Sequence, residues 1–363
     1  MSISDTAGGQ RRRVAIVLFN LGGPDRPEAI EPFLYNLFSD KAILAIPQPF
    51  RTLLARTLSR RRAPMAQLTY ERLGGRSPLL ENTEGQAAAL ERIGWGEGDL
   101  KVFIAMRYWA PRAEQVALAV KDWNPDEVVL LPLYPQHSTT TTASSLAEWE
   151  RAAAHARLKV PTRAICCYPR EPGFVKANAR LAGWALAEAA AHAPPRLLFS
   201  AHGLPERTVA RGDPYQWQCE QTAAAVVAEL GFPDLDWVLC YQSRATPVKW
   251  IGPSTEDEIK RAGREAKSVV VVPIAFVSEH VETLVEIGEE YRALAAWEGV
   301  PWFVPVPTVS VDNAFIQGLA GLVALARSQP DGVCSGERHR ICPHKFSKCP
   351  MPKSSGPPDL RPR

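Results

Sequence analysis

The stretch that decides the fold reads VVVVPIAF at residues 269–276 and continues as VSEHVETLVEIGEEY at residues 277–291. A continuous apolar run of this length is typical of a strand that is buried on both faces, as in a parallel sheet. The second part has helical spacing, because glutamates recur in it at short, regular intervals. These are Glu279, Glu282, Glu286 and Glu290. The stretch therefore predicts a buried strand that leads into a helix with one acidic face.

This acidic face has two interpretations. A row of glutamates on a helix is usually a solvated surface, but no lysine or arginine neutralises the row between His280 and Glu290. The row also begins where the strand ends, and α/β proteins bind ligands at the carboxyl ends of their strands. Tyr291 and the neighbouring valines are expected on the opposite, apolar face. We therefore expect the row, together with His280, to pass protons or to bind hard cations.

The rest of the chain alternates apolar, strand-like runs with helical patterns. The apolar runs lie at residues 14–19, 101–105, 127–133, 163–168, 196–201 and 237–241. The helical patterns lie at residues 172–192, 214–230, 255–265 and 313–327. Repeated strand–helix units build parallel sheets with helices on both faces. The predicted fold class is therefore α/β.

The two halves of the chain resemble each other. DEVVLLPLYPQHS at residues 126–138 has the same pattern as SVVVVPIAFVSEH at residues 268–280, with a strand, a proline and a turn that contains histidine. We expect two similar Rossmann-like, doubly wound domains with parallel sheets, at residues 1–155 and 156–328. A polar tail, residues 329–363, follows them. The facing strand ends of two such domains are expected to form a cleft for a ligand.

Composition restricts the function and the location. The chain has 363 residues and a formal net charge of +3, which gives no reason to expect a nucleic-acid partner. Its first ten residues are polar and small, unlike a signal peptide, and no apolar run approaches the ~20 residues that span a bilayer. A cytoplasmic location is therefore predicted. Seven cysteines in a cytoplasmic chain favour metal or redox chemistry. The sequence is compatible with a monomer or a homodimer.

One further histidine stands at a predicted strand end. His202 lies in SAHGLP, residues 200–205, at a position that mirrors the start of the first half. A lone histidine is more often structural, but a neutral imidazole at such a place accepts a proton near pH 7 or binds a metal. Glu282 is the expected partner of His202. The glycine-rich loops that bind nucleotide phosphates are absent from the sequence, so a nucleotide ligand is not expected.

A set of motifs in order along residues 14–327 resembles the ferrochelatase family. The motifs are LFNLGGPD (18–25), AMRYW (105–109), LPLYPQ (131–136), SAHGLP (200–205), QSR (242–244), KW (249–250) and PIAFVSEHVETL (273–284). The resemblance implies the chelatase fold of two Rossmann-like domains. It also implies an enzyme that inserts ferrous iron into protoporphyrin IX, with release of two protons, as the last step of haem biosynthesis.

The resemblance also implies roles for individual residues. His202 corresponds to the active-site histidine and Glu282 to its carboxylate partner, and these two would meet the iron substrate. Glu286 and His280 would continue a polar path away from the ring. The residues implied to bind the porphyrin are Leu21, Arg107, Tyr108 and Trp250. The sequence leaves open whether His202 accepts the pyrrole protons or guides the iron.

Other functions share these features. A coproporphyrin III ferrochelatase and a chelatase for another tetrapyrrole would have the same fold, although Leu21 favours protoporphyrin IX. From another class, a two-lobed protein that binds a metal or haem would also present two facing domains. Repeated turnover of porphyrin and ferrous iron would distinguish the enzyme from the binder.

Residues 41–62 combine apolar side chains with arginines, a pattern that suits an interfacial segment. In the family this region resembles the lip over the porphyrin site, which meets the membrane. The resemblance thus implies peripheral contact with the inner face of the cell membrane. An ordinary core-packed helix with a basic end is the alternative.

The tail carries three cysteines, Cys334, Cys342 and Cys349. With His339 or His344 they could form a zinc site. Family members with such a tail instead hold a two-iron two-sulfur cluster, with a fourth ligand from inside the chain. The position that provides that ligand in animal members is Thr139 here. The resemblance to certain bacterial members implies Cys167, with Cys166 as the alternative, whereas Cys219 and Cys240 are expected to be buried or incidental.

Overall fold

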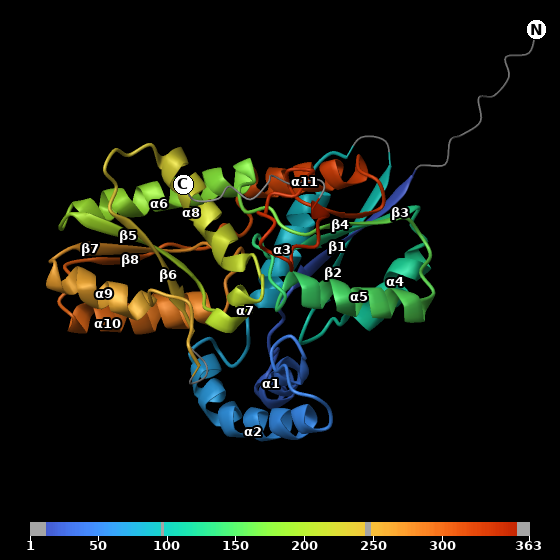
Figure 1. The fold of residues 1–363 in the computed structure, drawn as a ribbon, viewed down its shortest axis with the longest axis horizontal. Coiled ribbons are helices and arrows are strands. Elements are labelled where there is room, and N and C mark those ends of the chain that lie inside the picture. The colour runs from blue at the N-terminus through green and yellow to red at the C-terminus, as the bar shows by residue number, and fades with distance from the viewer. Residues whose placement is uncertain (1–11, 96–97, 244–247, 354–363) are drawn as a thin grey trace, which may run out of the picture.

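The computed structural model describes residues 12–95, 98–243 and 248–353. Its strands form two parallel sheets that lie side by side, each with helices on both faces (Figure 1). This arrangement confirms the predicted α/β fold of two similar, doubly wound units. Arg244, which belongs to one of the quoted motifs, lies outside the described residues.

The first sheet has the strand order β2–β1–β3–β4–β9. Its strands are β1 (Arg13–Asn20), β2 (Asp99–Met106), β3 (Glu127–Pro132), β4 (Thr162–Ile165) and β9 (Gly332–Cys334). Successive side chains of a strand point to opposite faces, so apolar runs such as β3 feed two cores. Val129 and Leu131 pack toward α3 (Leu79–Glu91) and α11 (Asn313–Arg327). Val128 and Leu130 pack toward α4 (Ala113–Trp123) and α5 (Thr142–Ala156).

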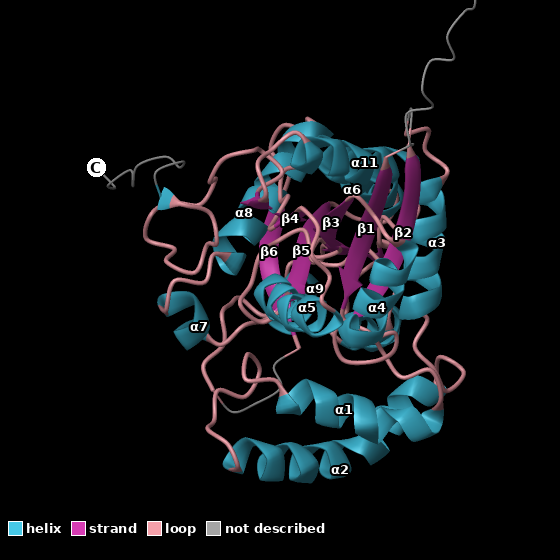
Figure 2. Cartoon of the chain, turned by 90° about the vertical axis from the view of Figure 1, so that its right-hand side faces the viewer, coloured by secondary structure: helices cyan, strands magenta, loops and turns pink. Residues whose placement is uncertain are grey.

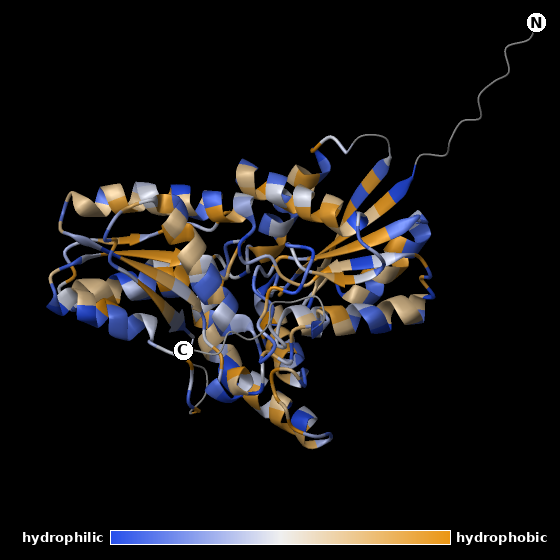
Figure 3. Cartoon of the chain, turned by 45° about the horizontal axis from the view of Figure 1, so that its top comes forward, coloured by the Kyte–Doolittle hydropathy of each residue, from blue (hydrophilic) through white to orange (hydrophobic). Residues whose placement is uncertain are grey.

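The second sheet has the order β6–β5–β7–β8 and is built in the same way. Its strands are β5 (Pro195–His202), β6 (Trp237–Gln242), β7 (Ser268–Pro273) and β8 (Phe303–Pro305). One face is covered by α6 (Pro172–Ala190) and α8 (Tyr215–Leu230), and the other by α9 (Thr255–Arg264), a π-helix (Glu282–Glu290) and α10 (Tyr291–Trp297). The strands of both sheets are the most hydrophobic parts of the molecule in Figure 3.

In each sheet the first strand of the unit lies between the next two strands, β1 between β2 and β3, and β5 between β6 and β7. This shared strand order agrees with the resemblance between residues 126–138 and residues 268–280. The chain reverses its winding direction at β5, where open α/β sheets bind ligands beyond the carboxyl ends of the strands. Ser200 of β5 pairs with Pro273 of β7, so His202 and the segment after β7 emerge side by side.

Two short strands were not predicted, β8 and β9. β9 comes from the tail and pairs with β4, with Cys334 opposite Ile165. Helix α11 also packs on the first sheet and not on the second. Two expected strands are shorter than their apolar runs: β4 ends at Ile165 and β7 at Pro273. The proline lacks the N–H group that would continue the ladder of β7.

Helices α1 (Ile30–Ser39) and α2 (Phe50–Glu71) form an arm that projects from the two sheets (Figure 2). The arm has an apolar core of its own, which includes Phe33 and Phe38 and against which Val281 packs. It therefore lies against the segment that follows β7. Among the described residues no helix is long and apolar enough to cross a membrane. Two shorter helical segments, Pro27–Ala29 and α7 (Glu206–Ala210), complete the fold.

A buried carboxylate attaches the arm to the first sheet. Asp40, at the end of α1, accepts hydrogen bonds from Arg107 Nη2 at 2.8 Å, from Tyr108 Oη at 2.8 Å and from Ser144 Oγ. Burial alone would raise the pKa of Asp40, but the hydrogen bonds from Ser144 and the Ala42 amide, with the charge of Arg107, lower it below its ordinary value. The arm is thus fixed by an ionised carboxylate at its first bend.

Candidate active site

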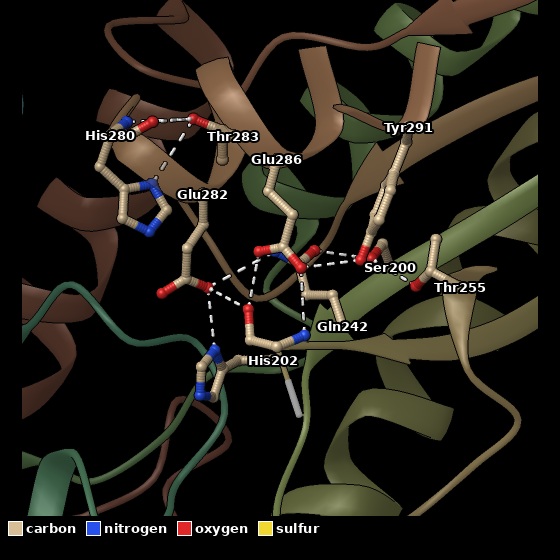
Figure 4. Close-up of polar contacts among 10 residues, drawn as sticks. Ser200, His202, Gln242, Thr255, His280, Glu282, Thr283, Glu286 and Tyr291 are labelled. Atoms are coloured by element: carbon tan, nitrogen blue, oxygen red, sulfur yellow. Dashed lines mark hydrogen bonds and ion pairs between the residues drawn. The ribbon is translucent and has the colours of Figure 1, made fainter. Parts of the chain in front are cut away.

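His202 is the last residue of β5, and its imidazole reaches the segment that follows β7. Its Nδ1 lies 2.8 Å from Oε2 of Glu282, and Figure 4 shows the two side chains facing each other. The next residue, Gly203, allows this close approach of chain segments. A Cβ atom there would lie 2.8 Å from the carbonyl oxygen of Gln242 and 3.3 Å from the ring of Trp250. The His202 side chain stays 41% exposed, so its other ring nitrogen is accessible from outside.

Glu286 lies beside Glu282 in a dense set of donors. Its Oε2 accepts from Ser243 Oγ at 2.7 Å and from Gln242 Nε2 at 3.2 Å, and its Oε1 accepts from Tyr291 Oη at 2.8 Å. Ser243 Oγ also lies 3.3 Å from Oε2 of Glu282, so one hydroxyl connects the two carboxylates. Figure 4 shows this chain of contacts from His202 to Tyr291.

The acidic row is divided in a way that the helical pattern did not predict. Only Glu282 and Glu286 turn toward His202. Glu279 accepts from Thr283 Oγ and from the Thr308 amide, and Glu290 pairs with Arg72 on the surface. Tyr291 is buried in an apolar core of the second unit, as expected, but its hydroxyl also donates to Glu286, which was not predicted.

The cause is the π-helix Glu282–Glu290, in which hydrogen bonds close five residues apart. An α-helical wheel therefore separates residues five apart, such as Glu286 and Tyr291, which the π-helix brings together. π-Turns occur frequently at functional sites. Ser243 adds a second irregularity, because its φ of 62° lies in the left-handed region that few residues other than glycine adopt.

The charges of the pair are set by burial and by each other. Burial would lower the pKa of His202, but the charge and hydrogen bond of Glu282, with the charge of Glu286, raise it above its ordinary value. Burial would raise the pKa of Glu282, but the charge and hydrogen bond of His202 outweigh it and lower the pKa to about 2. Glu282 is therefore a permanent anion, and it favours a proton on His202.

The two outer groups have the opposite tendencies. Burial and the neighbouring charge of Glu282 raise the pKa of Glu286, so this carboxylate accepts a proton more readily than an ordinary glutamate. Burial lowers the pKa of His280, against the charges of Glu282 and Glu279. His280 lies with its ring 4.5 Å from that of Phe276 and its Nδ1 toward Thr283, so it is held in place beside Glu282.

The predicted porphyrin-binding residues are placed in different surroundings. Trp250 packs over Gly203 next to His202. Leu21 is half-buried against the apolar core of the arm. Arg107 and Tyr108 are buried, and both contact Asp40 as described above, with a further ion pair from Arg107 to Glu148 at 3.2 Å. Their observed contacts attach the arm to the first sheet; a direct contact with a porphyrin stays a prediction.

Sequence reasoning missed Tyr70, near the end of α2. Its side chain is buried, and burial together with the charge of Glu282 raises its pKa. The arm therefore brings a hydroxyl to within electrostatic reach of the site. Nothing in the local sequence marks Tyr70, because its role depends on how the arm folds back.

The predicted cluster ligands come together in a second region, where the tail returns to the first sheet. Cys166, Cys167, Cys342 and Cys349 share one buried cluster. Cys334 joins it through β9, where the Cys166 amide donates to the Cys334 carbonyl at 2.8 Å. The sulfur atoms of Cys166 and Cys167 are 3.6 Å apart. Within the described ranges no three His, Cys, Asp or Glu side chains are grouped so as to hold a metal ion.

The surroundings of these thiols act differently on their charge: hydrogen bonding and burial raise the pKa values of Cys167 and Cys342, and burial raises that of Cys334, whereas the pKa of Cys349 is lowered. Arg340 is buried and donates to the carbonyl oxygens of Cys342, Phe346 and Met351. The hydrogen bond to Cys342 outweighs burial and, with the Met351 amide and the charge of Arg340, lowers the pKa of Cys349 to about 7. Gln218 Nε2 also donates to Cys342 Sγ at 3.1 Å.

Known proteins share both the sequence and the fold. A family model described as Ferrochelatase matches residues 13–326. A ferrochelatase of Phenylobacterium zucineum is 52% identical over 347 residues, which cover 93% of this chain and 97% of that protein. A ferrochelatase of Caulobacter vibrioides is 48% identical over 342 residues, with coverage of 93% and 97%.

A solved structure, SirB from Bacillus subtilis with Fe3+, aligns with a TM-score of 0.52 over 88% of this chain and 99% of that chain. At 10% identity this likeness concerns the fold alone, and it agrees with the predicted chelatase fold. The family matches decide against the alternative of a two-lobed binding protein, because they extend along almost the whole chain. The chain therefore belongs to the ferrochelatase family, and it is an enzyme that inserts iron into a porphyrin in haem synthesis.

Proposed function

We propose that this chain inserts ferrous iron into protoporphyrin IX and that His202 accepts the pyrrole protons, with Glu282 as its partner. The observation that carries the proposal is the 2.8 Å contact between His202 Nδ1 and Glu282 at the end of β5. An ionised carboxylate only accepts hydrogen bonds, so Nδ1 carries the proton of the neutral imidazole. Its Nε2 then presents a lone pair toward an incoming ring.

The stoichiometry of insertion fits this set of side chains. A porphyrin loses two protons from its pyrrole nitrogens as Fe²⁺ binds the four ring nitrogens. His202 Nε2 accepts a proton, and the resulting imidazolium is stabilised by Glu282. Ser243 Oγ connects Glu282 to Glu286, whose raised pKa suits it to receive a proton in turn. This path leads away from the exposed face of His202.

The same lone pair supports the alternative role of His202 as a guide for the iron. A carboxylate hydrogen-bonded to the other imidazole nitrogen is the usual partner of a metal-binding histidine. The proton role is favoured here by the adjacent Glu286, which provides a second acceptor beyond Glu282.

The substrate is proposed to be protoporphyrin IX because the arm that lies over the site has an apolar core, against which Leu21 and Trp109 pack. A ring with fewer carboxylates has less charge to bury there. We expect a higher kcat/KM with protoporphyrin IX than with coproporphyrin III in a fluorescence assay of ferrous iron insertion. A preference for coproporphyrin III would overturn this assignment without affecting the role of His202.

The arm is also proposed to contact the inner face of the cell membrane. Four large apolar side chains of α2 are exposed: Phe50 (67%), Leu53 (68%), Met65 (69%) and Leu68 (59%). Their spacing places them on one side of the helix. Arginines such as Arg56 and Arg61 lie between them in the sequence and can meet anionic headgroups.

Wild-type protein is therefore expected to float with anionic liposomes, whereas the Leu53→Ser/Met65→Ser variant is expected to stay in the soluble fraction. The Trp297→Ser variant is the control, because Trp297 is 87% exposed on α10, away from the arm. Equal flotation of all three proteins, or of none, would contradict contact through α2.

We further propose that Cys167, Cys334, Cys342 and Cys349 hold a two-iron two-sulfur cluster. The support is the burial of all four thiols in one region beside the buried cation of Arg340. A cluster of this kind divides four thiolates between two irons, so it does not need three ligands around one ion. Bound there, it would supply a link between the tail and the first sheet.

Purified wild-type protein is expected to contain acid-labile sulfide and to absorb visible light, and Cys349→Ser is expected to lose both. Cys240→Ala is the matched control, since Cys240 is buried in the second unit. Colourless wild-type protein without sulfide would contradict the cluster. Zinc in its place would favour the alternative site with His339 or His344.

A further inference from the structure

Side chains of the first unit contact the segment after β7 at several points along its length. Gln86 Nε2, on α3, donates to the Val277 carbonyl at 2.7 Å. Asn82 Nδ2, one turn earlier on α3, donates to the Glu279 carbonyl at 3.0 Å. The segment that carries Glu282 and Glu286 is therefore positioned by groups from the opposite unit and not only by its own sheet.

The last of these contacts is made by Arg72, which follows α2 at the end of the arm. Its Nη2 lies 2.7 Å from Oε2 of Glu289, and its Nη1 lies 2.8 Å from Oε1 of Glu290. Gly74 and Gly75 follow with φ values of 77° and 85°, and their amides bond back to the last turn of α2. This turn fixes the direction from which Arg72 approaches the π-helix.

The end of the π-helix needs such a contact. Its hydrogen bonds close five residues apart, and π-helices are rare and occur mostly as single turns inside α-helices. Here it extends over nine residues, Glu282–Glu290. A change to α-helical bonding would rotate Glu286 about the axis relative to Glu282. Residues four apart share a face in either helix, but residues five apart do not share one in an α-helix, so Glu286 would lose the hydrogen bond from Tyr291 that orients its carboxylate.

We propose that Arg72 is a positioning residue, which holds the last turn of the π-helix against the arm and so keeps Glu282 and Glu286 directed at His202. The inference rests on the proposed function of His202 and Glu282. The Arg72 side chain is 40% exposed, whereas the hydrogen bond from Gln86 to Val277 is buried. Solvent therefore reaches the contact of Arg72 but not that of Gln86. The position of the arm and the orientation of the two carboxylates are thereby coupled.

Replacement of Arg72 by alanine tests the proposal. We expect kcat for ferrous iron insertion to fall by about fivefold, the equivalent of the ~1 kcal/mol that a partly exposed ion pair contributes. The pH at which activity rises is expected to move down, since Glu282 no longer holds the raised pKa of His202. Salt screens exposed charges, so the difference from wild type is expected to shrink near ~1 M salt. Hydrogen exchange in residues 283–290 is expected to be faster.

Arg76→Ala is the matched control, because Arg76 pairs only at 3.5 Å with Glu81 within the first unit. It is expected to behave as wild type in all four measurements. The charge reversal Arg72→Glu is expected to lower kcat more than Arg72→Ala does. The second substitution Glu290→Arg is expected to restore part of that loss. If Arg72→Ala does not fold, this pair of variants tests the proposal in its place.

An Arg72→Ala variant with the activity, pH profile and exchange of Arg76→Ala would overturn the inference. Failure of the proposed function has a different signature. In that case His202→Ala would retain activity, whereas faster exchange in Arg72→Ala would still report the contact with the π-helix.

Discussion

Iron insertion is expected to fall by a factor of about 10²–10⁴ in kcat when His202 is replaced by alanine, the range for loss of a general base. The physical reason is that Nε2 of His202 is the accessible lone pair backed by Glu282, at 2.8 Å from Nδ1. The side chain is 41% exposed, so its removal leaves no buried cavity and the fold is expected to persist. Porphyrin affinity, measured by fluorescence quenching, is expected to change little.

The control for this variant is His155→Ala. His155 is exposed on α5 and distant from β5. Wild-type turnover in His155→Ala with loss of turnover in His202→Ala would support the assignment. Wild-type turnover in both would show that another group receives the pyrrole protons.

The largest expected effect on stability comes from Glu127, at the start of β3. Its side chain is buried, and it pairs with Arg163 of β4 and Arg327 of α11, each at 2.9 Å. Glu127→Gln keeps the shape but removes the shared anion, so two arginines lose their common partner. Breaking a buried ion pair in this way costs about 3–5 kcal/mol. We expect that decrease in the free energy of unfolding, measured by urea denaturation.

The matched control is Glu31→Gln, because Glu31 pairs with Arg60 at 3.5 Å on the exposed surface of the arm. Exposed pairs contribute about 0–1 kcal/mol. Equal destabilisation by the two variants would show that Glu127 does not join β3, β4 and α11 as described. The comparison also reports whether α11 stabilises the first sheet.

Much of the fold could be predicted from the sequence because its strands are continuous apolar runs. The runs at 127–133 and 269–276 identify central strands, and their resemblance to each other indicates two similar units. The edge strands β8 and β9 were not predictable in the same way, since strands of three residues carry too few alternations to show a pattern.

The site was predictable in its chemistry but not in its geometry. His202 and Glu282 stand at strand ends, and their proximity follows from the topology. The helical pattern could not reveal the π-helix, because the three- and four-residue spacing of the glutamates suits an α-helix equally well. Tyr70 and Arg72 were missed for a different reason: their contacts depend on how the arm folds over the second unit.

The most direct test of the central claim is the pH dependence of kcat for wild type and Glu282→Gln. The neutral imidazole accepts a proton, so insertion by wild type is expected to rise with pH through the raised pKa of His202. In Glu282→Gln the anion that raises this pKa is lost while the burial that lowers it remains.

The rise of the Glu282→Gln profile is therefore expected at lower pH than in wild type, with a lower plateau because the imidazolium has lost its counter-charge. Glu81→Gln, on the exposed face of α3, is expected to keep the wild-type profile. A Glu282→Gln profile that rises at the wild-type pH would contradict the claim that Glu282 and His202 act together as the proton acceptor.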